Sequence, residues 1–173
     1  MNILIAYGSS EGQTRKIVEA IAARLREHGH TADLFDTASN PVELRVEAYD
    51  KIIVAASVHQ ERHQESVEIF VITKLTKVHK PTLFISVSLS AAFPRGRADA
   101  QSYLDAFVKT TDWNPTHSML VAGALRFDEY DYFKQQIVEH VVLKDHQTNQ
   151  PKGDYEFTDW APLFQTIDSF VGS

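Results

Sequence analysis

Short apolar runs alternate along the chain with longer segments of helical periodicity. The run at residues 51–57 is nearly continuous, which is typical of a strand covered on both faces of a parallel sheet, whereas residues 31–36 are short and alternating. Between the runs, apolar side chains recur every three or four residues, as in a helix that buries one face. The predicted strands cover residues 3–5, 31–36, 51–57, 82–87 and 118–123. The predicted helices cover residues 14–28, 40–48, 64–78, 98–111 and 159–171.

This alternation predicts an α/β fold, with an open, mostly parallel five-stranded sheet and helices on both faces. Right-handed crossovers allow the flavodoxin-like strand order 2-1-3-4-5. We expect residues 1–173 to form a single domain, with an excursion at 126–158 between the last strand and the last helix. Ligands of such sheets bind at the carboxyl ends of the strands, where the loops 9–14, 57–63 and 88–97 would converge.

The loop after the first strand has the composition of an anion-binding loop. A strand–loop–helix connection directs backbone amides and the positive end of a helix dipole at one point, which suits a phosphate. Glycine lets the backbone approach the anion, hydroxyl side chains add donors, and no lysine or arginine lies between Ala6 and Thr14. The six residues of the loop are Ser9, Ser10, Glu11, Gly12, Gln13 and Thr14.

Other phosphate loops fit this stretch less well. A Walker motif requires Gly-Lys-Ser/Thr, and the dinucleotide fingerprint requires three glycines, neither of which Gly8 and Gly12 supply. The loop resembles the FMN-phosphate loop of flavodoxins, Thr/Ser-x-Thr-Gly-Asn-Thr; the alternative is an ordinary turn rich in small residues. Glu11 stands where flavodoxins carry a hydroxyl, and because an ionised carboxylate cannot donate to a phosphate, we expect its side chain to point outward.

Charge and composition narrow the functional classes. The net charge of −6, without any basic run, argues against nucleic-acid binding. The chain has no cysteine, so redox chemistry would have to come from a cofactor rather than from thiols. Residues 1–5 lead directly into a strand and no 18-residue apolar run occurs, so we expect neither a signal peptide nor a membrane span, and a cytoplasmic location.

The whole chain resembles the bacterial menaquinone-dependent protoporphyrinogen oxidase family, a flavodoxin-like FMN group. The shared segments, in the same order and at nearly the same spacing, are Glu11–Arg15, Tyr49-Asp50, Ala56-Ser57 with His63, Ser86-Val87 with Leu89, Ala122–Arg126, and Thr158-Asp159-Trp160. The resemblance implies an FMN-dependent oxidoreductase of heme and porphyrin biosynthesis. It would oxidise protoporphyrinogen IX, pass the electrons to a quinone, and lie peripherally on the inner membrane.

The resemblance also implies which residues hold the cofactor. The loop 9–14 would bind the FMN phosphate, and two further loops would flank the flavin ring. Their residues are Ser57, Val58, His59, Gln60, Ser88, Leu89, Ser90 and Ala91. His59 would stack on the ring or lie in solvent. Its pairing with His63 is not the helical zinc pattern and falls on a loop, so we predict no metal site.

Arg126, Arg95 and Arg62 all fall at the ligand end of the predicted sheet. Guanidinium groups match carboxylates bidentately, so these residues are candidates for binding the propionates of a porphyrinogen, the alternative being solvated loop charges. No catalytic acid–base pair stands out, and none is predicted. Expected partners are a porphyrinogen, a quinone, a membrane surface contacted through 130–145 and a second copy of the chain.

Two other functions stay open at this point. The first is a flavodoxin-like electron carrier that binds a redox partner protein and turns over no small substrate. Carriers of this kind usually show acidic surface around the flavin, whereas the arginines above favour an anionic small substrate. The second is an FMN-binding domain without activity, which Glu11 in the phosphate loop keeps open.

Overall fold

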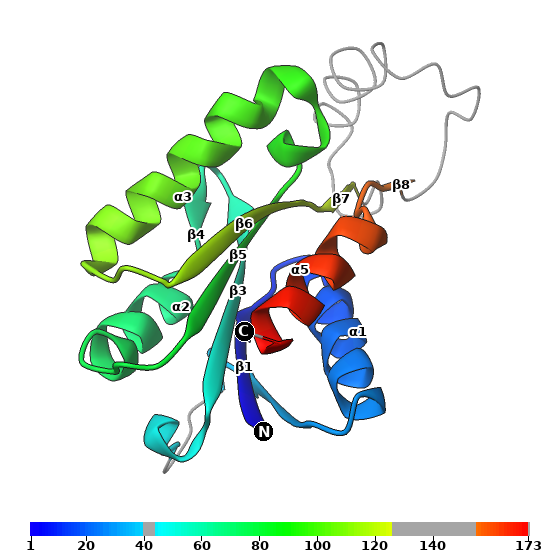
Figure 1. The fold of residues 1–173 in the computed structure, drawn as a ribbon. Coiled ribbons are helices and arrows are strands. Elements are labelled where there is room, and N and C mark those ends of the chain that lie inside the picture. Colours follow the sequence, from blue (N-terminus) through cyan, green and yellow to red (C-terminus); the bar gives the residue numbers. More distant parts are fainter. Residues whose placement is uncertain (40–43, 126–154, 173) are drawn as a thin grey trace.

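A computed structural model describes residues 1–39, 44–125 and 155–172. Its central sheet is parallel and has the order β2-β1-β3-β5-β6 (Figure 1), which confirms the order predicted from the sequence. The five strands are β1 (Asn2–Gly8), β2 (Thr31–Asp36), β3 (Lys51–His59), β5 (Thr82–Ser88) and β6 (His117–Ala122). After β1 the chain adds β2 on one side of it and then β3 on the other side. This reversal defines the switch point of the sheet, which lies at the carboxyl ends of β1 and β3.

Helices cover both faces of this sheet. On one side lie α1 (Gln13–Glu27) and α5 (Trp160–Gly172), and on the other lie α2 (Glu65–Phe70) and α3 (Arg97–Thr111) (Figure 1). Successive side chains of a strand point to opposite faces, so Ile3 and Ile5 join the first core and Leu4 joins the second. The continuous apolar runs of the sequence therefore reflect strands buried on both sides.

Two predicted helices differ from the structure. The predicted helix 64–78 is shorter, because α2 passes into a π-helical segment, Val71–Leu75, and ends there. The predicted helix 40–48 is wrong over its described part: 44 and 45 are irregular, and only a 3-10 turn forms at Val46–Ala48. The buried Val46 anchors that short turn to the core, and three residues suffice for this contact.

Three two-residue strands were not predicted. β4 (Arg62–His63) folds back on β3 as an antiparallel hairpin, and β7 (Ala124–Leu125) pairs with β8 (Tyr155–Glu156). Segments this short have no periodicity that could reveal them. The turn of the β3–β4 hairpin is also unusual, because Gln60 (φ 49°) and Glu61 (φ 64°) hold left-handed backbone conformations without being glycine or asparagine.

The β7–β8 pair returns the chain from the predicted excursion to the carboxyl end of the sheet. The amide of Phe157 donates to the carbonyl of Gly123 at 3.0 Å, directly after β6. Arg126 and the predicted membrane-contacting segment 130–145 lie outside the described residues. Within the described part of the chain, no helix is both long and apolar enough to cross a membrane.

Candidate functional site

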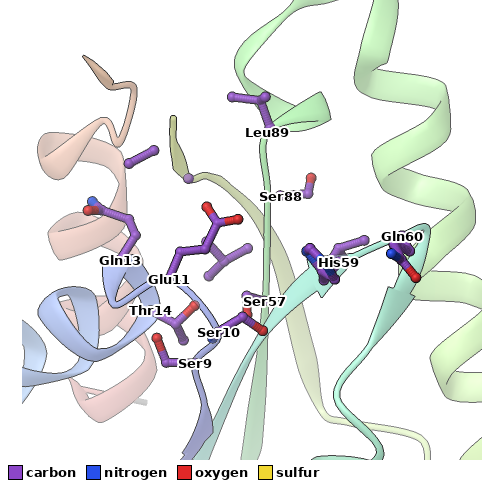
Figure 2. A pocket seen from close by; sticks show the side chains of 14 residues that line it. Ser9, Ser10, Glu11, Gln13, Thr14, Ser57, His59, Gln60, Ser88 and Leu89 are labelled. Carbon is purple, nitrogen blue, oxygen red and sulfur yellow. The ribbon is translucent and has the colours of Figure 1, made fainter. Parts of the chain in front are cut away.

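A cavity of about 310 Å³ lies at the carboxyl ends of β1, β3 and β5, at the switch point of the sheet (Figure 2). The three loops expected to converge contribute to it. Its lining includes the predicted residues Ser9, Ser10, Glu11, Gln13, Thr14, Ser57, Val58, His59, Gln60, Ser88 and Leu89. The remaining lining residues, which we did not predict as cofactor contacts, are Val87, Gly123 and Ala124.

Three predicted cofactor residues, Gly12, Ser90 and Ala91, are outside this lining. Gly12 has no side chain and supplies the turn of the loop instead, and Ser90 and Ala91 belong to a 3-10 segment after β5. Gly123 and Ala124 belong to the Ala122–Arg126 segment shared with the oxidase family, so that segment could have identified them. Val87 belongs to the shared Ser86-Val87 segment, but its place in an apolar strand indicates a core residue rather than a cofactor contact.

The loop between β1 and α1 is folded around the Ser9 hydroxyl. Ser9 Oγ accepts hydrogen bonds from the amides of Gly12 at 3.1 Å and Arg15 at 3.4 Å. Gly12 has a left-handed φ of 86°, which glycine adopts without steric cost. Ser9 thereby satisfies an amide of the first helical turn, while Gln13 and Thr14 stand at the helix start, where amides lack acceptors within the helix.

Thr14 is the clearest sign that the cavity holds an anion. Its hydroxyl lines the cavity and is buried, and Thr14 Oγ1 has no hydrogen-bond partner within the described residues. A buried hydroxyl without a partner costs roughly 1–3 kcal/mol, so the fold gains when a ligand supplies an acceptor. The surrounding donors are neutral hydroxyls and amides at a helix start, and this set fits a flavin phosphate.

Glu11 does not point outward as expected. Its side chain lines the cavity and is half-buried (Figure 2). A carboxylate on the wall of an anion site disfavours the anion unless solvent or a partner group offsets its charge.

The other walls of the cavity come from the β3–β4 hairpin and from the loops after β5 and β6. His59 is exposed on the hairpin and lines the cavity, so its stacking on a flavin stays a prediction. Ser88, in the wall after β5, is fixed by two hydrogen bonds: its Oγ accepts from the amide of Ala91 at 3.2 Å and its carbonyl accepts from the amide of Gly123 at 3.0 Å. These bonds hold the loops after β5 and β6 together at the edge of the cavity.

His63 lies behind the hairpin, where it is buried. One ring nitrogen is 2.9 Å from Ser86 Oγ, and the ring packs against Phe84 and Phe107. Burial lowers the pKa of His63 to about 4, and the neighbouring Glu68 carboxylate opposes this shift. The His63 ring is therefore uncharged at neutral pH, and its contacts in the core hold β4 of the hairpin in place. His59 thus lines the cavity, whereas His63 is buried in the core.

Two of the candidate substrate arginines, Arg62 and Arg95, lie outside the lining of the cavity. Arg62 donates through Nε and Nη2 to the two carboxylate oxygens of Glu68, at 3.1 and 2.6 Å. Glu68 is buried, and this pairing raises the pKa of Arg62. Arg95 is exposed in the 3-10 turn Pro94–Gly96, and Arg126 is outside the described residues.

A parallel sheet in this order, with a phosphate-type loop and a cavity at its switch point, defines the class of doubly wound α/β proteins that bind a flavin or nucleotide. Residues 4–152 match the family model described as the flavodoxin domain, and the chain belongs to that family. Flavodoxin-like sheets bind FMN at the β1/β3 switch point, which is where this cavity lies. The family and the site therefore agree on FMN as the cofactor.

Among curated proteins, the chain is similar to two named oxidoreductases. It is 28% identical over 162 residues to protoporphyrinogen IX dehydrogenase [quinone] of Escherichia coli strain K12, covering 92% of this chain and 89% of that protein. It is 22% identical over 171 residues to the protein of the same name from Leishmania major, covering 97% of this chain and 74% of that one.

Solved flavodoxins share the fold. Oxidised flavodoxin 1 of Bacillus cereus has a TM-score of 0.53 and 16% identity, with 86% of this chain and 100% of that chain covered. A point mutant of Fusobacterium nucleatum flavodoxin, solved with bound flavin mononucleotide, has a TM-score of 0.50 and 16% identity, with 99% and 94% covered. At these identities the likeness concerns the fold alone.

Proposed function

We propose that this protein is an FMN-dependent oxidoreductase that oxidises protoporphyrinogen IX and passes the electrons to a quinone. The observation that carries the proposal is similarity over nearly the full length to relatives named for this reaction, 92% of this chain against the Escherichia coli protein. A cavity with a flavin-phosphate donor set, at the position where the fold binds FMN, supports it.

In this proposal the chain's own residues bind and orient the cofactor. The loop 9–14 holds the phosphate through the Thr14 and Ser10 hydroxyls and the amides of the helix start. FMN held in this way would supply the redox chemistry, which the side chains of the site do not provide. The hairpin residue His59 on one side and Leu89 on the other confine the ring, with Ser90 and Ala91 extending the second wall.

Binding of the proposed substrate depends on positive charge near the cavity. The protein carries a net charge of −6, so a substrate with propionate groups is attracted only where positive charge is concentrated. We propose Arg62, Arg95 and Arg126 for this role. Arg62 is already paired with Glu68, but its side chain is 65% exposed, and a guanidinium has donors beyond the two used in that pair.

The acceptor side involves a membrane-soluble quinone. We propose a cytoplasmic protein that contacts the inner membrane peripherally through 130–145, and that works alone or as a homodimer. The apolar side chains of this segment would bring the flavin to the quinone without a membrane span.

The deciding experiment is anaerobic stopped-flow spectroscopy. The FMN-loaded protein is mixed with protoporphyrinogen IX, and the flavin absorbance is followed near its visible maximum. We expect bleaching, reversed when a menaquinone analogue is added; the apoprotein is the control. A flavin that stays oxidised would contradict the proposal and would favour an electron carrier for a protein partner. Failure to take up FMN would refute the assignment of the phosphate loop.

A further inference from the structure

Gln64 connects the two sides of the switch point with one side-chain amide. It stands directly before α2, after the β3–β4 hairpin. Its Nε2 donates to Ser10 Oγ at 2.9 Å, on the loop after β1, and also to Ser57 Oγ, near the end of β3. Both serines line the cavity, whereas Gln64 itself is not part of the lining.

These hydrogen bonds determine which groups the hydroxyls of Ser10 and Ser57 can donate to. Ser57 Oγ accepts from Gln64 Nε2 and also from the backbone amide of Ser10 at 3.4 Å. A hydroxyl has two acceptor lone pairs and one donor hydrogen. With both lone pairs of Ser57 in use, its hydrogen is left to donate to a group in the cavity. Ser10 Oγ likewise receives a hydrogen bond and keeps its own O–H for donation.

The Gln64 amide is held by the two hydrogen bonds of its Nε2 end. Gln64 Oε1 is buried and has no hydrogen-bond partner in the described part of the chain. It lies over Gly8, where an added Cβ would stand 3.1 Å from Oε1 and 2.6 Å from Val67 Cγ2. The amide can occupy this position because residue 8 has no side chain.

We propose that Gln64 is a positioning residue that makes the site specific for a phosphorylated flavin. Its amide fixes the Ser10 and Ser57 hydroxyls as donors, and paired donors stabilise an anion but contribute less to an uncharged ligand. The inference rests on the proposed FMN binding. It predicts that Gln64 governs the preference for FMN over riboflavin, which lacks the phosphate, and has little effect on the affinity for the flavin ring.

The test compares FMN and riboflavin binding to the apoprotein, by titration with quenching of flavin fluorescence. In Gln64→Glu the carboxylate would accept from both hydroxyls, so we expect FMN affinity to fall by about 100-fold while riboflavin affinity changes by less than about threefold. Gln64→Met removes the donors without adding charge, and we expect a fall of about tenfold for FMN alone. Gln101→Glu, on the exposed face of α3, controls for the added charge and should bind both flavins as the unaltered protein does.

Two results would overturn the inference. One is unaltered FMN affinity in both Gln64 variants, and the other is an equal loss of FMN and riboflavin affinity, which would show a general structural role. If Gln64→Glu does not fold by circular dichroism, Gln64→Met decides alone. Failure of the FMN binding on which the inference rests looks different, because the unaltered protein would then bind neither FMN nor inorganic phosphate.

Discussion

The side-chain amide of Gln13 donates to Thr158 Oγ1 at 2.9 Å, joining residues 145 positions apart in the sequence. Both side chains are buried, and Thr158 Oγ1 in turn donates to the carbonyl of Ala122 at 2.7 Å. This chain of hydrogen bonds ties the start of α1, beside the cavity, to the end of β6 and to the segment that precedes α5. The last segment of the chain thus helps to fix the cofactor loop.

Replacing Thr158 by valine should therefore destabilise the fold. The substitution keeps the shape but removes the hydrogen bond that Gln13 donates to Thr158 and the one that the Ala122 carbonyl accepts from it, so we expect the free energy of unfolding to fall by about 1–3 kcal/mol in urea denaturation. Thr166→Val is the matched control, because the Thr166 hydroxyl bonds back to its own helix at Pro162, and we expect a change within about 0.5 kcal/mol. Equal effects would contradict the role of Thr158.

Thr14 should show opposite effects on the apoprotein and on cofactor binding. In Thr14→Val, no hydrogen bond is lost, because Thr14 Oγ1 has no partner among the described residues, so the apoprotein should be as stable as before or slightly more stable. FMN affinity should fall by about 10- to 100-fold, the value of a hydrogen bond to a charged group. Thr14→Ser keeps the hydroxyl and should retain most of the affinity. An apoprotein clearly destabilised by valine would contradict this account.

His63 should make stability fall in mild acid. Its pKa is about 4 in the folded protein, below the ordinary value of 6.5, because burial disfavours the charged ring. Its stabilising contribution is complete above pH 6.5 and is lost as pH falls toward 4, since the unfolded chain then binds a proton that the folded chain does not. The full effect is about 3 kcal/mol.

Urea denaturation of His63→Gln between pH 7 and pH 4 checks this expectation. The variant is less stable than the unaltered protein at pH 7, having lost the ring contacts with Phe84 and Phe107. Its stability should nevertheless decline less on acidification, by about 2–3 kcal/mol, because residue 63 no longer titrates. His79→Gln, the same replacement at an exposed position, is the control for the substitution itself. Parallel pH profiles for His63→Gln and the unaltered protein would refute the assignment.

The proposed role of Arg62 in substrate binding can be tested separately from its salt bridge with Glu68. Arg62→Gln alone leaves the buried Glu68 carboxylate unpaired and should lower stability. The double variant Arg62→Gln with Glu68→Gln removes both charges and should recover most of that loss. If Arg62 binds a propionate, both variants raise KM for the porphyrinogen severalfold with kcat unchanged. Glu68→Gln alone is the control and should not raise KM; a normal KM in the double variant would eliminate Arg62 as a substrate residue.

The sequence by itself determined the sheet and the position of the cofactor loop. Runs such as Ile3–Ile5 and Lys51–Ser57 predict strands buried on both faces, because a strand covered by helices on both sides is rich in apolar residues along its whole length. Chain order and the right-handed crossover rule then place the loop 9–14 at the switch point. These features depend on residues close together in the chain, so a local pattern carries them.

Only the tertiary structure decided which contacts between segments hold the walls of the cavity in place. The β3–β4 hairpin, with Gln60 in a left-handed conformation, and the cavity-facing side chain of Glu11 follow from packing between segments rather than from local propensity. The same holds for Gln64 against Ser10 and Ser57, and for the salt bridge of Arg62 with Glu68. A side-chain hydrogen bond needs its two atoms about 3 Å apart, and that distance is set by the register of strands and helices, which no single segment of the sequence encodes.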